Sequence, residues 1–298
     1  MIRHSDRLLL DVGGTFIKCS DGRCIPMPSA GSRDEIATAL RLAVAGLVPG
    51  GRGVRAAESL TPSGECCPNS PATPQSPALA VAIPGPFDYE KGIFLMRHKF
   101  AAVYGESFRA LAGLPEDADI FFCHDVIAAL LGCEGENVAL VTIGTGLGFA
   151  HKENGRVQVG PTGSPARPIY NLPWGDGILE DVVSARGLRT AYTRLTGRGD
   201  LSAAQIAHLA QNDDEAALQV FSDLGETFGE ALAPILEELH IGTLLLAGQI
   251  SKSLPLFERP LRNALDGIEV TLAPEGAVFT GLGRLADAAK PRFDTLER

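Results

Sequence analysis

The 298-residue chain lacks the sequence features of membrane, secreted and zinc-stabilised proteins. No apolar run approaches the roughly 18 to 20 residues that a membrane-spanning helix needs. The apolar stretch near the start is too short for a signal peptide. None of the six cysteines forms a C-x-x-C pair, which favours free thiols over a disulfide framework or a zinc site. We therefore expect a cytoplasmic protein without a membrane partner.

The chain also lacks a basic stripe. Asp and Glu outnumber Lys and Arg by 36 to 26, which gives a formal net charge of −10, so nucleic acid is not an expected partner. This balance does not exclude an anionic ligand, because a local glycine-rich turn can bind phosphate whatever the global charge. The composition is that of a soluble globular protein, 45% hydrophobic and 21% charged, and the length allows two domains.

Two stretches of the chain have the same pattern, LLLDVGGTFIKCSDGR at 8–23 and ALVTIGTGLGFAHKENGR at 139–156. Each predicts a buried strand, a glycine turn, a second strand and a further turn. When Gly13 is aligned with Gly144, Asp11 stands opposite Thr142. The repeat predicts two lobes that open with similar hairpins, although two ordinary hairpins remain an alternative.

Further strands and helices follow both hairpins, which predicts a mixed α/β protein. Ser32 and Glu35 have the spacing of a capping box at the first helix. Helices are predicted over 32–47, 105–114, 126–132, 176–188, 202–211, 213–239 (bent or broken near Pro234), 253–265 and 277–290. The segment 48–77 is rich in Pro, Ser and Gly and predicts a long surface loop.

The glycine turns indicate phosphate binding, because glycine lets backbone N–H groups approach an oxyanion. Neither turn fits a dinucleotide fingerprint, since a strand and not a helix follows GTGLG, and no G-x-x-x-x-G-K-[ST] motif is present. Asp11 is placed to hold the Mg²⁺ that a triphosphate carries. The predicted phosphate-binding residues are Asp11, Gly13, Gly14, Thr15, Lys18, Gly144, Thr145 and Gly146.

Six segments, in chain order, resemble motifs of the ROK family of bacterial glucokinase-like sugar kinases. They are LLLDVGGTFIK, VAIPGPFD, HDVIAALLGC, VTIGTGLGFA, GILEDVVSARGL and LLLAGQIS. The resemblance implies a two-lobed actin-like (ribonuclease-H-like) α/β fold, with mixed five-stranded sheets flanked by helices and with ATP and sugar in the cleft between lobes. The lobes would comprise 1–124 plus 279–298 and 125–278. The family also suggests a homodimer.

The resemblance implies the residues that bind the acceptor and the nucleoside. Asp125 would be the base that takes the proton from the sugar hydroxyl, although an acid there could instead serve as the N-cap of the next helix. The implied sugar-binding positions are Pro84, Gly85 and Glu180, and the implied adenosine positions are Gly248 and Gln249.

Three segments depart from the family pattern. The cysteine cluster that binds zinc in many ROK proteins is missing before Glu180, so we expect no structural zinc. Ser164 and Arg167 stand where the family has the Glu and His of its sugar clamp. The basic stretch 97–99 lies where relatives place a sugar-binding Asn. If two of the bases Arg97, His98 and Lys99 line the cleft beside Arg167, the substrate would be a sugar acid, a sugar phosphate or another polyol derivative, and His98 and Arg167 are the predicted contacts.

The altered clamp leaves a second function open, a non-catalytic nucleotide- or sugar-binding protein on the same fold. ROK repressors carry a helix-turn-helix before the first glycine motif. Here that motif begins at residue 11, so a DNA-binding repressor is not expected.

Overall fold

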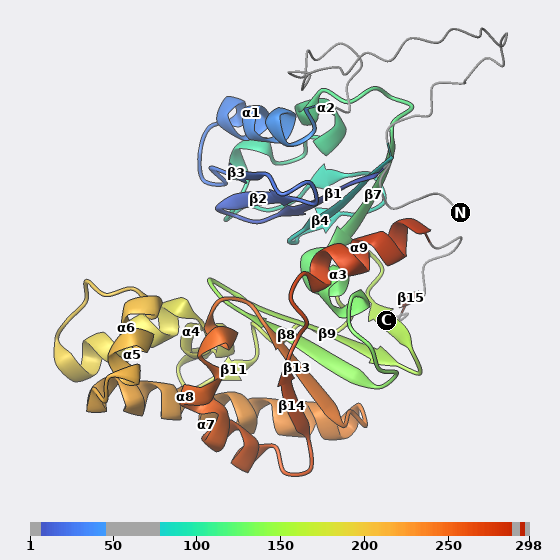
Figure 1. Cartoon of the computed structure of the whole chain (residues 1–298). Coiled ribbons are helices and arrows are strands. Elements are labelled where there is room, and N and C mark those ends of the chain that lie inside the picture. The colour runs from blue at the N-terminus through green and yellow to red at the C-terminus, as the bar shows by residue number, and fades with distance from the viewer. Residues whose placement is uncertain (1–6, 46–77, 288–292, 296–298) are drawn as a thin grey trace, which may run out of the picture. The chain divides into compact units, whose positions relative to one another are not determined.

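The computed structural model describes residues 7–45, 78–287 and 293–295, and the loop predicted over 48–77 lies outside the described residues. Contacts divide the chain into two compact units, Met1–Phe122 and Cys123–Arg298. The boundary falls two residues before the one expected from the sequence. Each unit is built around its own sheet (Figure 1).

The first unit contains a five-stranded mixed sheet in the order β3-β2-β1-β4-β7. Its strands are β1 (Arg7–Val12), β2 (Phe16–Cys19), β3 (Cys24–Pro26), β4 (Ala78–Ile83) and β7 (Asp119–His124), which continues two residues past the boundary of the unit. β1 pairs antiparallel with β2 and parallel with β4, so the first predicted hairpin is confirmed. The sheet thereby holds the turn between β1 and β2 at the carboxyl end of a central strand.

Two helices and an aromatic cluster complete the core of the first unit. In α1 (Arg33–Ala43) the Ser32–Glu35 capping box is formed as predicted. The second helix, α2 (Phe108–Ala112), packs on α1. The short strands β5 (Phe87–Asp88) and β6 (Ile93–Phe94) and the 3₁₀ turn η2 (Ala101–Val103) bring in aromatic rings. The buried rings include those of Phe87, Phe94, Phe100 and Phe108.

The second unit contains a six-stranded sheet in the order β14-β13-β8-β9-β10-β15. Its strands are β8 (Val138–Ile143), β9 (Leu147–Glu153), β10 (Arg156–Val159), β13 (Thr243–Ala247), β14 (Glu269–Leu272) and β15 (Phe293–Thr295). β8 and β9 form the second predicted hairpin, and β8 runs parallel to β13. β15 was not predicted, because a three-residue strand shows no periodicity.

Helices α3 (Asp125–Leu131) and α9 (Ala277–Asp287) lie side by side in this unit (Figure 1). Glycines allow their backbones to touch: a Cβ on Gly281 would lie 1.8 Å from the Ala128 carbonyl oxygen, and a Cβ on Gly132 would lie 1.9 Å from that of Ala277. The sequence prediction had assigned 279–298 to the first lobe. The packing instead attaches α9 to α3 of the second unit.

The remaining helices of the second unit are α4 (Leu179–Val182), α5 (Ala185–Thr196), α6 (Ala203–Gln211), α7 (Glu215–Glu238) and α8 (Leu254–Ala264). α7 packs on α8, and both share a core with Val141 and Ile143 of β8. α7 continues through Pro234, so the break that was one of the two predicted alternatives is absent there. Its buried face packs on α4, α5, α6 and α8.

The prediction of one continuous helix over 176–188 is wrong. The chain forms β12 (Gly177–Ile178), paired with β11 (Pro173–Trp174), then α4, and a new helix begins after Ser184. The Ser184 hydroxyl accepts the Gly187 N–H at 3.2 Å as an N-cap. A Cβ on Gly187 would lie 2.0 Å from the Val182 carbonyl oxygen, so this glycine lets α5 turn closely against α4.

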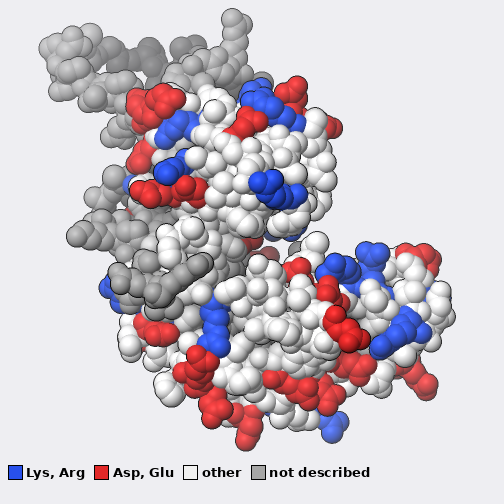
Figure 2. Space-filling model, turned by 180° about the vertical axis from the view of Figure 1, so that it is seen from behind, with Lys and Arg blue, Asp and Glu red and all other residues white. Residues whose placement is uncertain are grey.

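Surface charge is mixed. On the face drawn in Figure 2, Lys and Arg side chains lie in small groups among Asp and Glu. Within the described residues, no helix is both long and apolar enough to cross a membrane.

Candidate functional site

The first glycine turn, residues 13–15, joins β1 to β2. The Gly13 N–H donates to the Phe16 carbonyl at 2.9 Å and closes the turn. Among the described residues, the N–H groups of Gly14 and Thr15 donate to no acceptor, and both residues are at least partly exposed. Two neighbouring backbone donors are therefore available to an anion.

Charged and polar side chains surround this first turn. The Asp11 carboxylate lies 3.6 Å from the Lys18 ammonium, its cross-strand neighbour, and their side chains are 19% and 58% exposed. The Ser29 hydroxyl donates to the Gly14 carbonyl at 2.6 Å. The Lys99 stem also passes over Gly14. Lys18, predicted to bind phosphate, thus has a carboxylate partner within its own hairpin.

The second glycine turn, residues 144–146, joins β8 to β9. It is tighter than the first, because the Gly144 N–H donates to the Gly146 carbonyl at 3.0 Å. The N–H groups of Thr145 and Gly146 have no acceptor in the part of the chain that the structure describes. Both predicted turns therefore present a pair of backbone donors.

Glu180 lies directly against the second turn. Its Oε2 accepts the Leu147 N–H at 2.9 Å, and a Cβ on Gly146 would lie 3.0 Å from the same oxygen. The start of α5 adds a further contact, since the Ala185 N–H donates to the Gly144 carbonyl at 2.8 Å. The segment from Glu180 to Ala185 thus packs against the turn and hydrogen-bonds to it. The sequence spacing does not reveal this contact.

The predicted adenosine turn also meets the end of β8. Gly248 follows β13 with φ +94°, and a Cβ there would lie 2.4 Å from the Ile143 carbonyl oxygen. Gln249 is exposed and precedes the 3₁₀ turn η3 (Ile250–Ser253). Because β8 and β13 are parallel neighbours, their carboxyl ends bring Gly248, the second turn and Glu180 together, where α/β sheets usually bind ligands.

Asp125 is the first residue of α3. Its Oδ1 accepts the Val126 N–H at 2.7 Å and lies 2.8 Å from His124 Nδ1. The N-cap residue is His124, so the alternative that assigned the cap to Asp125 is wrong by one residue. The Asp125 side chain is 38% exposed. Gly148 of β9 lies beside Val126, which places the start of α3 against the second hairpin.

The residues at the altered sugar clamp interact within the second unit. Arg167 Nη2 lies 2.8 Å from Glu238 Oε2, and this guanidinium lowers the pKa of the Glu238 carboxyl. The Ser164 hydroxyl accepts that of Thr162 at 3.2 Å. Arg167 therefore has an anionic partner of its own.

The candidate substrate residues of the first unit lie on two loops. Pro84 and Gly85 follow β4 and are partly exposed, and His98 is exposed. The Arg97 guanidinium stacks over the Tyr104 ring at 4.0 Å. Of the three bases at 97–99, Lys99 is the one placed against a glycine turn.

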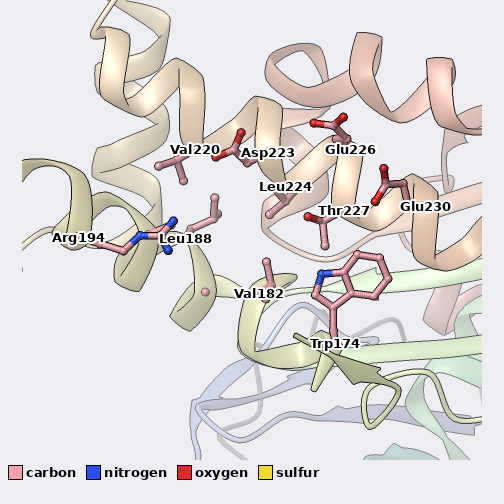
Figure 3. A pocket seen from close by; sticks show the side chains of 12 residues that line it. Trp174, Val182, Leu188, Arg194, Val220, Asp223, Leu224, Glu226, Thr227 and Glu230 are labelled. Carbon is pink, nitrogen blue, oxygen red and sulfur yellow. The ribbon is translucent and has the colours of Figure 1, made fainter. Parts of the chain in front are cut away.

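A pocket of about 450 Å³ lies elsewhere in the second unit, between α4, α5, α7 and β11 (Figure 3). Its lining includes Trp174, Arg194, Asp223, Glu226 and Glu230. In this view Trp174 and Arg194 lie at opposite ends, and the three acids project from α7. None of the residues predicted for the site lines it, and nothing in the sequence had singled it out.

Across the described ranges, no group of three His, Cys, Asp or Glu could hold a metal ion.

The chain is similar to a glucokinase from Halalkalibacterium halodurans, with 26% identity over 171 residues. The match covers 50% of this chain and 52% of that protein, so the chain spans about half the length of the curated relative it matches. No family model matches the chain.

Solved structures match over nearly the whole chain. A ROK hexokinase from Thermus thermophilus matches 93% of this chain and 96% of its own, with a TM-score of 0.65 and 21% identity. A ROK family glucokinase from Streptomyces griseus, solved with glucose and AMPPNP, matches 94% and 98%, with a TM-score of 0.70 and 19% identity. A ROK family transcriptional regulator matches 94% and 77%, with a TM-score of 0.67 and 18% identity. These matches show that the chain shares the α/β fold of the ROK family proteins that its sequence motifs resemble.

Proposed function

We propose that the chain is an ATP-dependent sugar kinase, which transfers the γ-phosphoryl group to a hydroxyl of a sugar or sugar derivative. The observation that carries the proposal is the pair of glycine turns, each with two backbone N–H groups that no acceptor among the described residues takes up. Two such turns suit a ligand with several phosphate groups. The Streptomyces griseus glucokinase, whose fold this chain shares, is solved with glucose and AMPPNP, which supports the same ligands here.

Asp11 is the residue that would hold Mg²⁺. Its carboxylate stands near the end of β1, two residues before the first turn, and is partly exposed. Mg²⁺ usually takes one or two carboxylates and fills its other positions with phosphate oxygens and water, so one carboxylate fits. When bound, Mg²⁺ would neutralise charge on the transferring phosphoryl group.

Asp125 would act as the base. Its contacts with the Val126 N–H and His124 orient the carboxylate at the start of α3. The carboxylate accepts the proton of the sugar hydroxyl while the hydroxyl oxygen bonds to the γ-phosphorus. The bond from the γ-phosphorus to the β,γ-bridging oxygen breaks, and ADP leaves.

The remaining residues would bind the acceptor and the nucleoside. Glu180 would orient a sugar hydroxyl from its place against the second turn. The other proposed contacts are Pro84 and Gly85 to the sugar and Gly248 and Gln249 to the adenosine. Recognition of an anionic sugar by His98 and Arg167 stays a prediction, and Arg167 would have to exchange Glu238 for the substrate.

A second candidate function is ligand binding without phosphoryl transfer. One solved protein of this fold is a transcriptional regulator. Ser164 and Arg167 stand where the family resemblance places two sugar-binding side chains, and both have partners within the second unit. These observations favour a protein that binds nucleotide or sugar and does not turn it over.

ADP release with Mg²⁺-ATP, measured over hexoses, N-acetylhexosamines, sugar acids and polyols, separates the two functions. We expect turnover on at least one acceptor, and we expect Asp125→Asn to lower kcat by about 10²- to 10⁴-fold. Its affinity for AMPPNP should stay within about twofold, because the nucleotide contacts are unchanged. Asp266→Asn, at an exposed position in the same unit, serves as the matched control.

The outcomes are distinct. Binding of AMPPNP without turnover on any acceptor would favour the second candidate. Turnover that persists in Asp125→Asn would remove the assigned base. A wild-type chain that binds no AMPPNP would contradict the kinase proposal altogether.

A further inference from the structure

Lys99 lies over the first glycine turn, although the two are distant in the sequence. A Cβ built on Gly14 would lie 3.6 Å from Lys99 Cδ and 3.8 Å from Cε, so the aliphatic stem covers this glycine at van der Waals distance. The ammonium is one C–N bond, about 1.5 Å, beyond Cε. The side chain thus brings a positive charge next to the turn that presents the open Gly14 and Thr15 donors.

Two hydrogen bonds fix the segment that carries Lys99. The Phe100 N–H donates to the Ser29 carbonyl at 2.7 Å, and the Ser29 hydroxyl donates to the Gly14 carbonyl at 2.6 Å. The Phe100 ring is fully buried. Ser29 therefore links the turn to the backbone beside Lys99, and the lysine is held near the turn by more than its own flexible stem.

The ammonium of Lys99 has no ion pair or hydrogen bond with any residue that the structure describes. The neighbouring cations are engaged: Lys18 lies 3.6 Å from the Asp11 carboxylate, and Arg97 stacks on Tyr104. Lys99 is only partly exposed, since its stem packs on Gly14, unlike a lysine that extends into solvent.

We propose that Lys99 is a phosphate-binding residue of the first turn, and that it adds a charged donor to the backbone N–H groups of Gly14 and Thr15. The inference rests on the proposed function, since its ligand is the polyphosphate of ATP. A cationic donor close to two open backbone donors suits the oxygens of a phosphate group, and charge-assisted hydrogen bonds are about twice as strong as neutral ones. The absence of a side chain on Gly14 is what leaves room for the lysine stem.

Lys99→Met tests this role, because methionine keeps an unbranched apolar stem over Gly14 and removes the charge. Binding is measured by titration calorimetry with Mg²⁺-AMPPNP, with adenosine and with tripolyphosphate. We expect AMPPNP and tripolyphosphate to bind about 10- to 100-fold more weakly at low salt, and the difference to shrink as ionic strength rises. Adenosine affinity and the melting temperature should not change. Lys91→Met, an exposed lysine of the same unit, is the control and should bind like wild type.

If wild type binds AMPPNP and Lys99→Met binds it with equal affinity, the role of Lys99 is overturned. The kinase proposal would still stand. A parallel loss of adenosine affinity would show a structural role and would also overturn it. Binding of tripolyphosphate without AMPPNP, weakened by Lys99→Met, would support the lysine and contradict the nucleotide kinase. Binding of neither phosphate probe to wild type would overturn both proposals.

Discussion

The two glycine turns share a sequence pattern but differ in the charged side chain that a distant segment of the chain places against their glycines. The first turn has the Lys99 stem over Gly14 and the Ser29 hydroxyl on its carbonyl. The second turn has the Glu180 carboxylate against Gly146, where it takes up the Leu147 N–H. Under the proposed function, this difference assigns phosphate binding chiefly to the first turn and gives the second turn an additional link to the acceptor. A repeated motif therefore sets the backbone path, while segments elsewhere in the chain set the charge.

The two hairpins also differ in burial. β2 alternates between exposed and buried residues, as a strand next to the sheet edge does. β9 is buried along most of its length on both faces and carries His151 and Lys152 in the interior. The Lys152 ammonium donates to the Cys133 carbonyl at 2.7 Å, which offsets part of the cost of its burial. The second hairpin is thus a core element, and the first is half solvated.

Gly248→Ala should give the largest loss of stability. Gly248 packs directly against the backbone of Ile143, the residue before the second turn. Alanine at φ +94° would be strained by about 1–2 kcal/mol, and its Cβ would also collide with the Ile143 carbonyl. Gly267→Ala carries the same strain at φ +77° but meets nothing within 4 Å, so it is a matched control. We expect Gly248→Ala to lower the free energy of unfolding by about 1–3 kcal/mol more than the control. Urea unfolding followed by fluorescence of Trp174, the single tryptophan, measures the difference, and equal losses would contradict the packing argument.

Glu180→Gln would test the charge difference between the turns. Glutamine keeps an oxygen for the Leu147 N–H and removes the negative charge. We expect the acceptor KM to rise about tenfold, while AMPPNP affinity at low salt stays equal or rises up to about fivefold as repulsion is removed. Glu237→Gln, exposed on α7, is the control. A clear loss of AMPPNP affinity in Glu180→Gln would show that the carboxylate supports nucleotide binding, and the contrast between the turns would fail.

The smallest effect should come from replacing His151, a buried residue of the second hairpin. Burial lowers the pKa of His151, the hydrogen bond from its ring to the Glu153 carboxylate opposes that shift, and nearby Arg167 lowers the pKa further. The folded state therefore favours the neutral ring, while the unfolded chain takes up a proton near pH 6.5. The free energy of unfolding should fall as pH drops below about 6.5. In His151→Gln the decline in melting temperature between pH 7.5 and 5.5, followed by Trp174 fluorescence, should be shallower.

The control for that measurement is His208→Gln, at an exposed position on α6, which should keep the wild-type pH dependence. An unchanged slope in His151→Gln would assign the acid sensitivity to other groups. That result would also show that the burial of β9 does not cause the pH dependence of the melting temperature.

Local sequence patterns predicted most of the elements correctly. The strands before Gly13 and Gly144 and the capping box at Ser32 all appear where they were expected. The errors lie where distant contacts override local preference. Gly187 lets α5 begin closely against the end of α4, and α7, which packs on four other helices, continues through Pro234.

The site was predictable only in part. The order of the sequence motifs assigned Gly248, Glu180 and the second turn to one site. The parallel pairing of β8 with β13 places them together. The partners of Arg167 and Lys99 were not predictable, since each depends on a residue far along the chain. The pocket beside Trp174 was missed for the same reason.

The sequence by itself determined the two strand–turn–strand hairpins, the α/β class and the glycine turns, because these follow from side-chain periodicity and from the backbone freedom of glycine. Only the tertiary structure decided which charge stands beside each turn, Lys99 at the first and Glu180 at the second. It also decided that α9 packs on α3, through Gly132 and Gly281. Such contacts join residues that local patterns leave independent, and their energies arise only when the folded backbone brings the groups within a few ångströms.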